Sequence, residues 1–120
     1  MQVTLQITQY RVSLGRKVGG LEIAAAAGGR CAVIECFGPV VTYERYVRIS
    51  FWPAGVELPP NVSVIQSPIV KAELNAPAQQ YTWYLDLLRN EAPIFAVVND
   101  VDPKQNTLAT TSEPVGEGEL

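Results

Sequence analysis

The sequence predicts a mainly β protein, a β-rich α+β fold with one helix, built as a single domain. The chain has 120 residues and a mass of 13.1 kDa, which is the size of one domain with its own core. Valine is commoner than leucine, with 15 residues against 10, and β-branched side chains favour strands. Most apolar segments alternate with a period of two, and one follows the period of a helix.

The first strand signal covers residues 2–14. Its apolar residues are odd-numbered up to Ile7 and even-numbered from Tyr10 onward, which is a slip of one residue near Thr8 and Gln9. A β-bulge at this point would bend one long strand, as the corner of a barrel requires. Two strands joined at the same point are the alternative.

The next two strands are separated by a short turn. Residues 30–37 form an apolar run, and the Gly38-Pro39 pair that follows is a turn signal. Residues 40–52 alternate most regularly, because the odd positions are apolar except at Arg45. This pattern indicates a half-buried antiparallel strand with one face in the core.

A loop with three prolines, residues 53–60, leads to two shorter strand candidates at 62–66 and 69–74. Pro68 lies between these candidates, and proline lacks the N–H group that a central strand donates to its neighbour. An edge strand or a bend is therefore expected there.

One helix is predicted, over residues 78–90. Asn75 is its expected N-cap, and Pro77 falls in the first turn, where a missing N–H costs nothing. Apolar residues recur at the i, i+3, i+4 and i+7 spacing of a helix face, and they are Tyr81, Tyr84, Leu85 and Leu88. Trp83 and Leu87 lie off this stripe, so the helix is expected either to plug the end of a barrel or to face a second surface.

The chain ends with a predicted hairpin, in which strands at 94–98 and 107–111 flank a turn at 100–106. The resulting order of three strands, a helix and two strands resembles that of the OB-fold, a five-stranded barrel. The resemblance implies a small antiparallel β-barrel with the order β-β-β-α-β-β. The extra short strands at 62–74 depart from that order and leave an Sm-like or SH3-like barrel, or a sandwich, as the alternative.

Charge is unevenly distributed along the chain. The formal net charge is −3, and residues 1–60 carry a net charge of +2 whereas residues 61–120 carry −5. Residues 113–120 are acidic and contain glycine, which is typical of a disordered tail, so the domain is expected to cover residues 1–112. The first residues do not form a signal peptide, and no apolar run reaches the roughly 18 residues that a membrane helix needs. We therefore expect a cytoplasmic protein with no membrane partner.

Several kinds of chemistry are excluded by residues that the sequence lacks. Histidine is absent, which excludes Ser-His-Asp and Cys-His catalysis and histidine metal ligands. Cys31 and Cys36 lie five residues apart on a predicted strand, so their side chains point to opposite faces and cannot form a disulfide. We expect no catalytic residues, no metal and no cofactor, and we predict that the protein is not an enzyme.

The residues that could bind a ligand or nucleic acid are aromatic and basic. Tyr46, Arg48 and Trp52 share one face of the long predicted strand, and Arg16 and Lys17 lie in a turn before it. In small barrels, exposed aromatic side chains stack on bases while cations follow the phosphates. In the alternative interpretation, the same aromatic residues are half-buried under the helix or lie in an oligomer contact. Net acidity also opposes a nucleic-acid partner, because such binding is mainly cationic.

The candidate interface residues are Trp83 and Leu87 on the helix. Together with Trp52 and the proline-rich loop, they provide more apolar surface than a small monomer needs. We therefore predict a non-enzymatic binding or assembly module that associates with itself as a homo-oligomer. The alternative is an OB-like or Sm-like protein that binds single-stranded nucleic acid.

Overall fold

Strands dominate the fold and form two sheets. The computed structural model describes residues 1–15 and 29–110. Within them the strands are β1 (Gln2–Ile7), β2 (Gln9–Leu14), β3 (Ala32–Phe37), β4 (Arg45–Trp52), β5 (Val62–Gln66), β6 (Ile69–Pro77), β7 (Ile94–Asn99) and β8 (Thr107–Thr110). Three of them form the small sheet, in the order β1-β7-β8. The other five form the large sheet, in the order β2-β3-β4-β6-β5.

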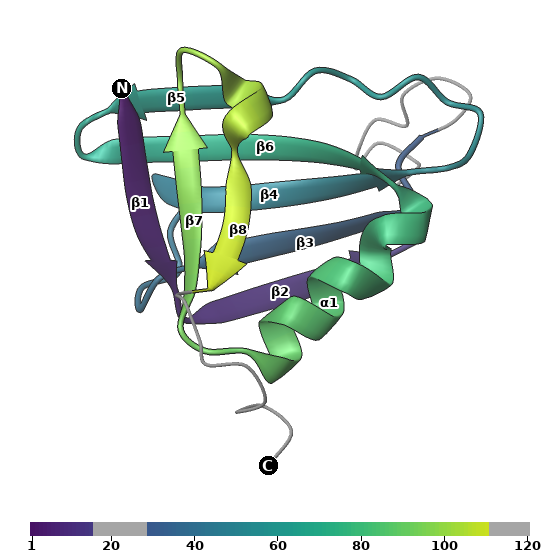
Figure 1. Ribbon diagram of the computed structural model, residues 1–120, viewed down its shortest axis with the longest axis horizontal. Coiled ribbons are helices and arrows are strands. Elements are labelled where there is room, and N and C mark those ends of the chain that lie inside the picture. Colours follow the sequence, from purple (N-terminus) through teal and green to yellow (C-terminus); the bar gives the residue numbers. More distant parts are fainter. Residues whose placement is uncertain (16–28, 111–120) are drawn as a thin grey trace.

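The two sheets form two layers around one core. In Figure 1 the strands of the small sheet run across those of the large sheet. Buried side chains from both sheets make up the core, among them Leu5, Ile34, Ile49, Leu74 and Val98. The mainly β prediction is confirmed, but the described strands do not close into a barrel. The two-layer sandwich, which the sequence left open as an alternative, comes nearer to this arrangement.

The chain passes from one sheet to the other at Thr8. β1 pairs with β7 in the small sheet, whereas β2 pairs with β3 in the large sheet. At the corner, the Thr8 N–H donates to the carbonyl oxygen of Phe37 over 2.9 Å. The expected β-bulge in one long strand was therefore wrong. The slip marks two strands joined at a corner, the alternative, because the inward face changes from odd residues such as Ile7 to even residues such as Tyr10.

The predicted strand is present as β4 from Arg45 onward, but the half-buried pattern was only partly right, because Tyr46 and Ser50 on the other face are buried as well. Val47, Ile49 and Phe51 are buried in the core, whereas the preceding residues 40–44 form no strand. β4 runs antiparallel to β3 and parallel to β6, so a purely antiparallel strand was the wrong expectation. The parallel pairing arises because β5 forms a hairpin with β6 and pairs on its outer side.

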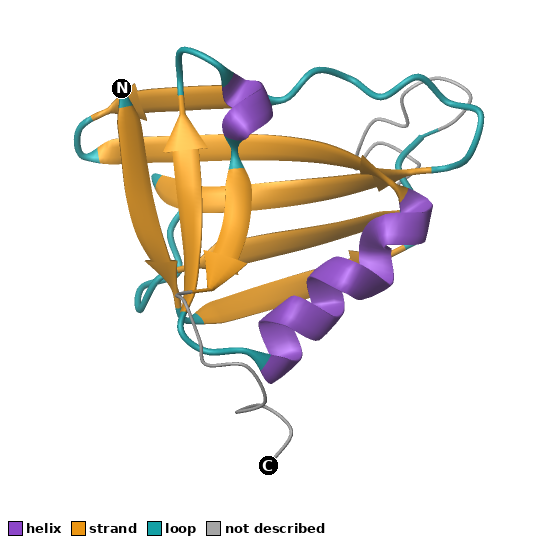
Figure 2. Ribbon diagram, viewed as in Figure 1, coloured by secondary structure: helices purple, strands orange, loops and turns teal. Residues whose placement is uncertain are grey.

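The helical segment packs against the edge of the core. It consists of a 3-10 turn, η1 (Ala78–Gln80), and the helix α1 (Tyr81–Asn90), which Figure 2 shows beside both sheets. The ring of Phe51 makes edge-to-face contacts with Tyr81 and Tyr84, at centroid distances of 5.3 and 5.6 Å. Asn75 does not cap the helix, since it lies inside β6, whose strand extends to Pro77.

The rest of the hairpin region agrees with the sequence pattern. The two strand candidates at 62–74 are present as β5 and β6, and the terminal hairpin is present as β7 and β8 with a 3-10 turn, η2 (Pro103–Gln105), between them.

Arg16, Lys17 and the acidic tail at 113–120 lie outside the described residues. In the part of the chain that the structure describes, no helix is long and apolar enough to span a membrane.

Candidate functional site

The outer face of the large sheet carries an ion-pair row across three strands. Glu35 on β3 and Glu73 on β6 both lie opposite Arg48 on β4 in the strand register. The Nη2 and Nε atoms of Arg48 lie 3.1 and 3.2 Å from Oε2 of Glu35, and its Nη1 atom lies 3.6 Å from Oε1 of Glu73. The Arg48 guanidinium therefore already has carboxylate partners on both sides.

The aromatic residues beside this row are also in contact with one another. The Arg48 guanidinium lies 5.1 Å from the centre of the Tyr46 ring, which packs edge to face on Tyr43 at 5.4 Å. The Tyr43 hydroxyl donates to Oε1 of Glu35 over 3.0 Å, and this bond raises the pKa of Tyr43 above its usual value. Tyr46 is only 8% exposed. Tyr46 and Arg48 therefore lie together, as predicted. Within the fold, however, the Tyr46 ring already contacts Arg48 and Tyr43, and the Arg48 charge is already paired with Glu35 and Glu73.

Trp52 lies at the end of β4 beside a hollow of about 300 Å³. Its indole N–H donates to Oδ1 of Asn75 over 2.8 Å, so the ring is held in place from β6. Pro59 and Pro60 form part of the wall. The sequence pattern missed Asn75 as a partner, because its position after an apolar run resembles a helix cap.

A second hollow of about 300 Å³ lies between α1 and β8. Trp83 forms one side of it and is 67% exposed, whereas Tyr84, Leu87 and Leu108 line the inside. Leu87 is half-buried and packs against the core, so it lies on the inner face of the helix with Tyr81, Tyr84 and Leu88 and not on its free face. The two predicted interface residues therefore border the same hollow but differ in what they contact.

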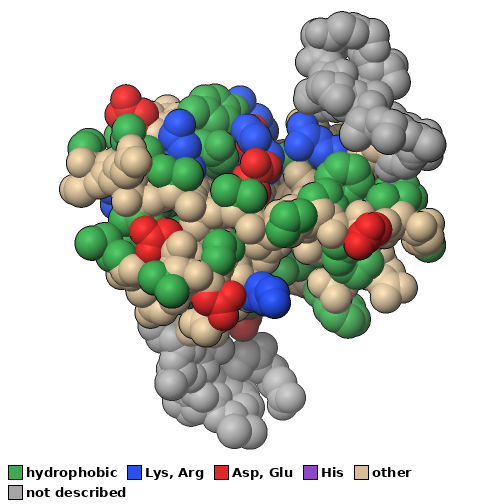
Figure 3. Space-filling view, turned by 90° about the horizontal axis from the view of Figure 1, so that it is seen from above, with side chains coloured by type: hydrophobic (Ala, Val, Ile, Leu, Met, Phe, Trp, Pro, Cys, Tyr) green, Lys and Arg blue, Asp and Glu red, His purple; other side chains and the backbone are tan. Residues whose placement is uncertain are grey.

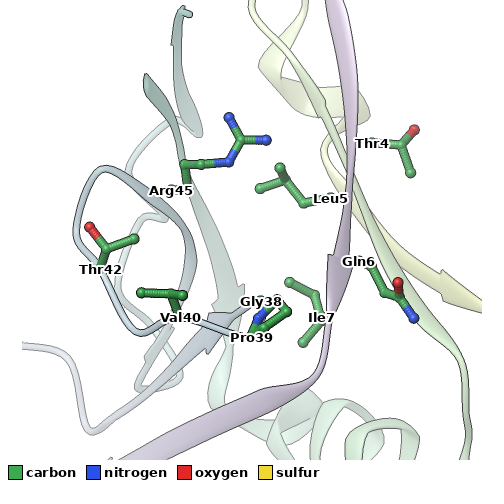
Figure 4. Close-up of a pocket in the computed structure, with 9 residues that line it drawn as sticks. All are labelled: Thr4, Leu5, Gln6, Ile7, Gly38, Pro39, Val40, Thr42 and Arg45. Atoms are coloured by element: carbon green, nitrogen blue, oxygen red, sulfur yellow. The ribbon is translucent and has the colours of Figure 1, made fainter. Parts of the chain in front are cut away.

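A third hollow, of about 350 Å³, lies between β1 and the loop before β4. Figure 4 shows Leu5 and Ile7 pointing into it from β1, with Val40 and Arg45 on the opposite side. The Arg45 guanidinium donates to the carbonyl oxygen of Pro68 over 2.6 Å, which fixes its position at the rim. This hollow was not predicted from the sequence. Residues 2–7 alternate polar and apolar side chains without a charge, and this pattern could have indicated an open strand there.

A broader hollow of about 810 Å³ separates the corner at Thr8 from the end of α1. Its lining mixes polar and apolar groups, with Tyr10, Leu88 and Glu91 among them. It brings together none of the candidate residues of the sequence analysis.

The two cysteines are free, as their spacing on a strand predicts. Cys36 is fully buried, and this burial raises the pKa of its thiol to about 12. The Cys31 sulfur contacts the carbonyl oxygen of Phe51 at 3.4 Å. In residues 1–15 and 29–110, no three cysteine or carboxylate side chains are grouped so that they could hold a metal ion.

Charges of both signs are mixed on the surface seen in Figure 3, where Lys and Arg side chains are interspersed with Asp and Glu.

Comparisons with protein-family models, curated proteins and solved structures give no match to this chain.

Proposed function

We propose that this chain is a non-enzymatic binding module that associates with copies of itself. The observation that carries the proposal is the 67% exposure of Trp83 beside the hollow between α1 and β8. Tryptophan combines a large apolar ring with one polar N–H, and it is enriched among the residues that contribute most to binding.

The surroundings of Trp83 have the features of an interface. Tyr84, Leu87 and Leu108 provide an apolar floor, and Gln80 and Asn106 provide polar groups at the margin. An apolar centre within a polar rim is the usual composition of a protein contact. A two-fold contact would place Trp83 of each copy against the hollow of the other, and this contact removes both rings from water.

The absence of an enzymatic role is supported by the state of the groups that could react. The chain has no histidine, and the Cys36 thiol is buried with a pKa raised to about 12, so it is protonated at neutral pH. Glu35 and Glu73 are both paired with Arg48. These groups are arranged to stabilise the fold.

The second candidate is an OB-like or Sm-like module that binds single-stranded nucleic acid. The hollow beside Trp52 favours it, since Arg30 and Ser50 line the same hollow and an indole ring can stack on a base. The paired state of Arg48 and the low exposure of Tyr46 reduce its support.

The test is the concentration dependence of molar mass, measured by size-exclusion chromatography with light scattering. The unsubstituted chain is expected to exceed the monomer mass of 13.1 kDa as concentration rises, and Trp83→Ala is expected to shift the association to higher concentration. Val101→Ala is the matched control, because Val101 is an apolar residue with 80% exposure that lies outside the hollow. A chain that stays monomeric at millimolar concentration would refute the proposal. If the Trp83→Ala and Val101→Ala variants associate equally, the surface at α1 is not the contact between copies.

A further inference from the structure

β1 is an edge strand of the small sheet. The alternation of hydrogen-bonded pairs with β7 shows which of its backbone N–H and C=O groups face outward. The Asp100 N–H donates to the carbonyl oxygen of Met1 over 3.2 Å, so Met1 occupies a hydrogen-bonded position opposite β7. Such positions alternate along an antiparallel pair, and therefore Val3 and Leu5 also bond to β7. Gln2, Thr4 and Gln6 direct their N–H and C=O groups away from β7.

Part of this outer edge is covered and part is open. A Cβ atom added at Gly38 would lie 3.4 Å from the carbonyl oxygen of Gln6, so the loop after β3 already covers the edge at Gln6. Beyond it, the Thr8 N–H is bonded to Phe37. Among the described strands none pairs with β1 on this side, and the open positions are Gln2 and Thr4.

The open edge lacks the features that usually prevent strand pairing. Native edges are commonly protected by charges, by proline or by a covering segment. Residues 2–7 contain no charged residue and no proline. By contrast, the edge strand β2 carries Arg11, and on the edge strand β5 the Ser63 hydroxyl accepts from Asn106 Nδ2, which follows η2, over 2.7 Å.

We propose that β1 pairs antiparallel with β1 of a second copy about a two-fold axis at Val3. In this register Gln2 lies opposite Thr4 of the other copy, so the open N–H and C=O groups of both residues are satisfied by the same residues of the partner. The two three-stranded small sheets would then form one continuous six-stranded sheet. An uncharged strand suits a two-fold contact, since such an axis would otherwise bring like charges together.

The hollow beside β1 supports a second copy as the occupant. The register places Met1 of the second copy opposite Leu5, on the face that borders this hollow. Met1 is 71% exposed in the single chain, and methionine fills irregular apolar gaps because it is unbranched and flexible. Leu5, Ile7 and Val40, which is 70% exposed, provide the apolar surroundings.

The inference rests on the proposed self-association, because it names one surface through which copies meet. It uses a different surface from the Trp83 contact. Figure 1 places β1 and α1 on opposite sides of the small sheet, with β7 and β8 between them. Either contact can therefore be removed without removing the other.

Disulfide trapping tests the register directly. In a non-hydrogen-bonded pair at the axis, the two Cα atoms would lie about 4.5 Å apart, which is within disulfide range. Under mild oxidation with diamide, Val3→Cys is expected to give a covalent dimer linked through the two substituted positions, as identified by peptide mass spectrometry. Glu57→Cys in an exposed loop is the control, because Glu57 lines neither the hollow beside β1 nor the hollow beside Trp83. It is expected to give no more dimer than the unsubstituted chain, which contains Cys31 and Cys36.

A second variant tests the backbone pairing without a thiol. Thr4→Pro removes an N–H that points away from β7, so the fold is expected to persist while the affinity of the β1 contact falls at least tenfold. Thr4→Ser keeps the N–H and is expected to associate normally. If the chain associates but Val3→Cys gives only the dimer level of the control and Thr4→Pro has no effect, the β1 pairing is wrong while self-association stands. If the unsubstituted chain is monomeric at every concentration, both proposals fail.

Discussion

Glu35 and Arg48 lie directly opposite each other on β3 and β4, and their side chains form two contacts, at 3.1 and 3.2 Å. Their side chains are only 16% and 24% exposed, so this pair is shielded more than an ordinary surface ion pair. Glu35 also accepts from the Tyr43 hydroxyl, so its carboxylate joins an arginine and a tyrosine on the outer face of the large sheet.

Removing the charge of Glu35 is expected to destabilise the fold. In Glu35→Gln, Arg48 keeps only the more distant Glu73, at 3.6 Å. The expected loss in the free energy of unfolding is about 1–2 kcal/mol, between the values for exposed and buried pairs. Urea unfolding measures it, with Glu57→Gln in an exposed loop as the control. If both variants unfold at the same urea concentration, the pair does not contribute to stability.

Trp83 and Leu87 are expected to respond differently to truncation. Leu87 packs against the core, so Leu87→Ala is expected to lower the free energy of unfolding by about 1–3 kcal/mol, less than for a fully buried leucine. Trp83→Ala is expected to change it by less than about 0.5 kcal/mol, because the ring is mostly in water. Thermal unfolding at low concentration, where the chain is monomeric, gives both values. A larger loss for Trp83 would show that its ring supports the fold.

Cys36 is expected to resist thiol reagents until the protein opens. The fold favours the protonated thiol, since burial raises its pKa from 9.0 to about 12. This preference contributes to stability below pH 9, and the contribution is lost as the pH rises from 9 towards about 12. In a Cys31→Ser background, the rate of iodoacetamide labelling at pH 8 should rise sharply on adding urea through the unfolding transition. Rapid labelling without urea would contradict the burial of this thiol.

The nucleic-acid alternative has its own measurement, a titration of a fluorescently labelled single-stranded oligonucleotide at low and high salt. We expect no binding at low salt, where the electrostatic contribution is largest, because Arg48 is already paired. Salt-dependent binding that is lost in Trp52→Ala and kept in Trp83→Ala would instead support the second candidate.

Local patterns in the sequence were enough to predict the strands but not their partners. The parity change around Thr8 and the alternation from Arg45 to Trp52 both correspond to real strands, since the side-chain period reports which face is buried. The parallel pairing of β4 with β6 depends on where the intervening hairpin packs. A barrel was therefore predicted where the described strands form two sheets.

The candidate site was harder to predict, because the role of a side chain depends on its neighbours across strands. Tyr46 and Arg48 were correctly placed together, but Glu35 and Glu73 approach Arg48 only through the strand register. Asn75 was expected to cap a helix, yet it holds the indole of Trp52. Such contacts join residues far apart in the chain, and no spacing rule reveals them.

Self-association is the central claim, and sedimentation equilibrium of the unsubstituted chain from micromolar to millimolar concentration tests it most directly. We predict an average mass that rises from 13.1 kDa towards twice that value and beyond, since two separate surfaces contribute. A mass that stays at 13.1 kDa over the whole range would contradict it.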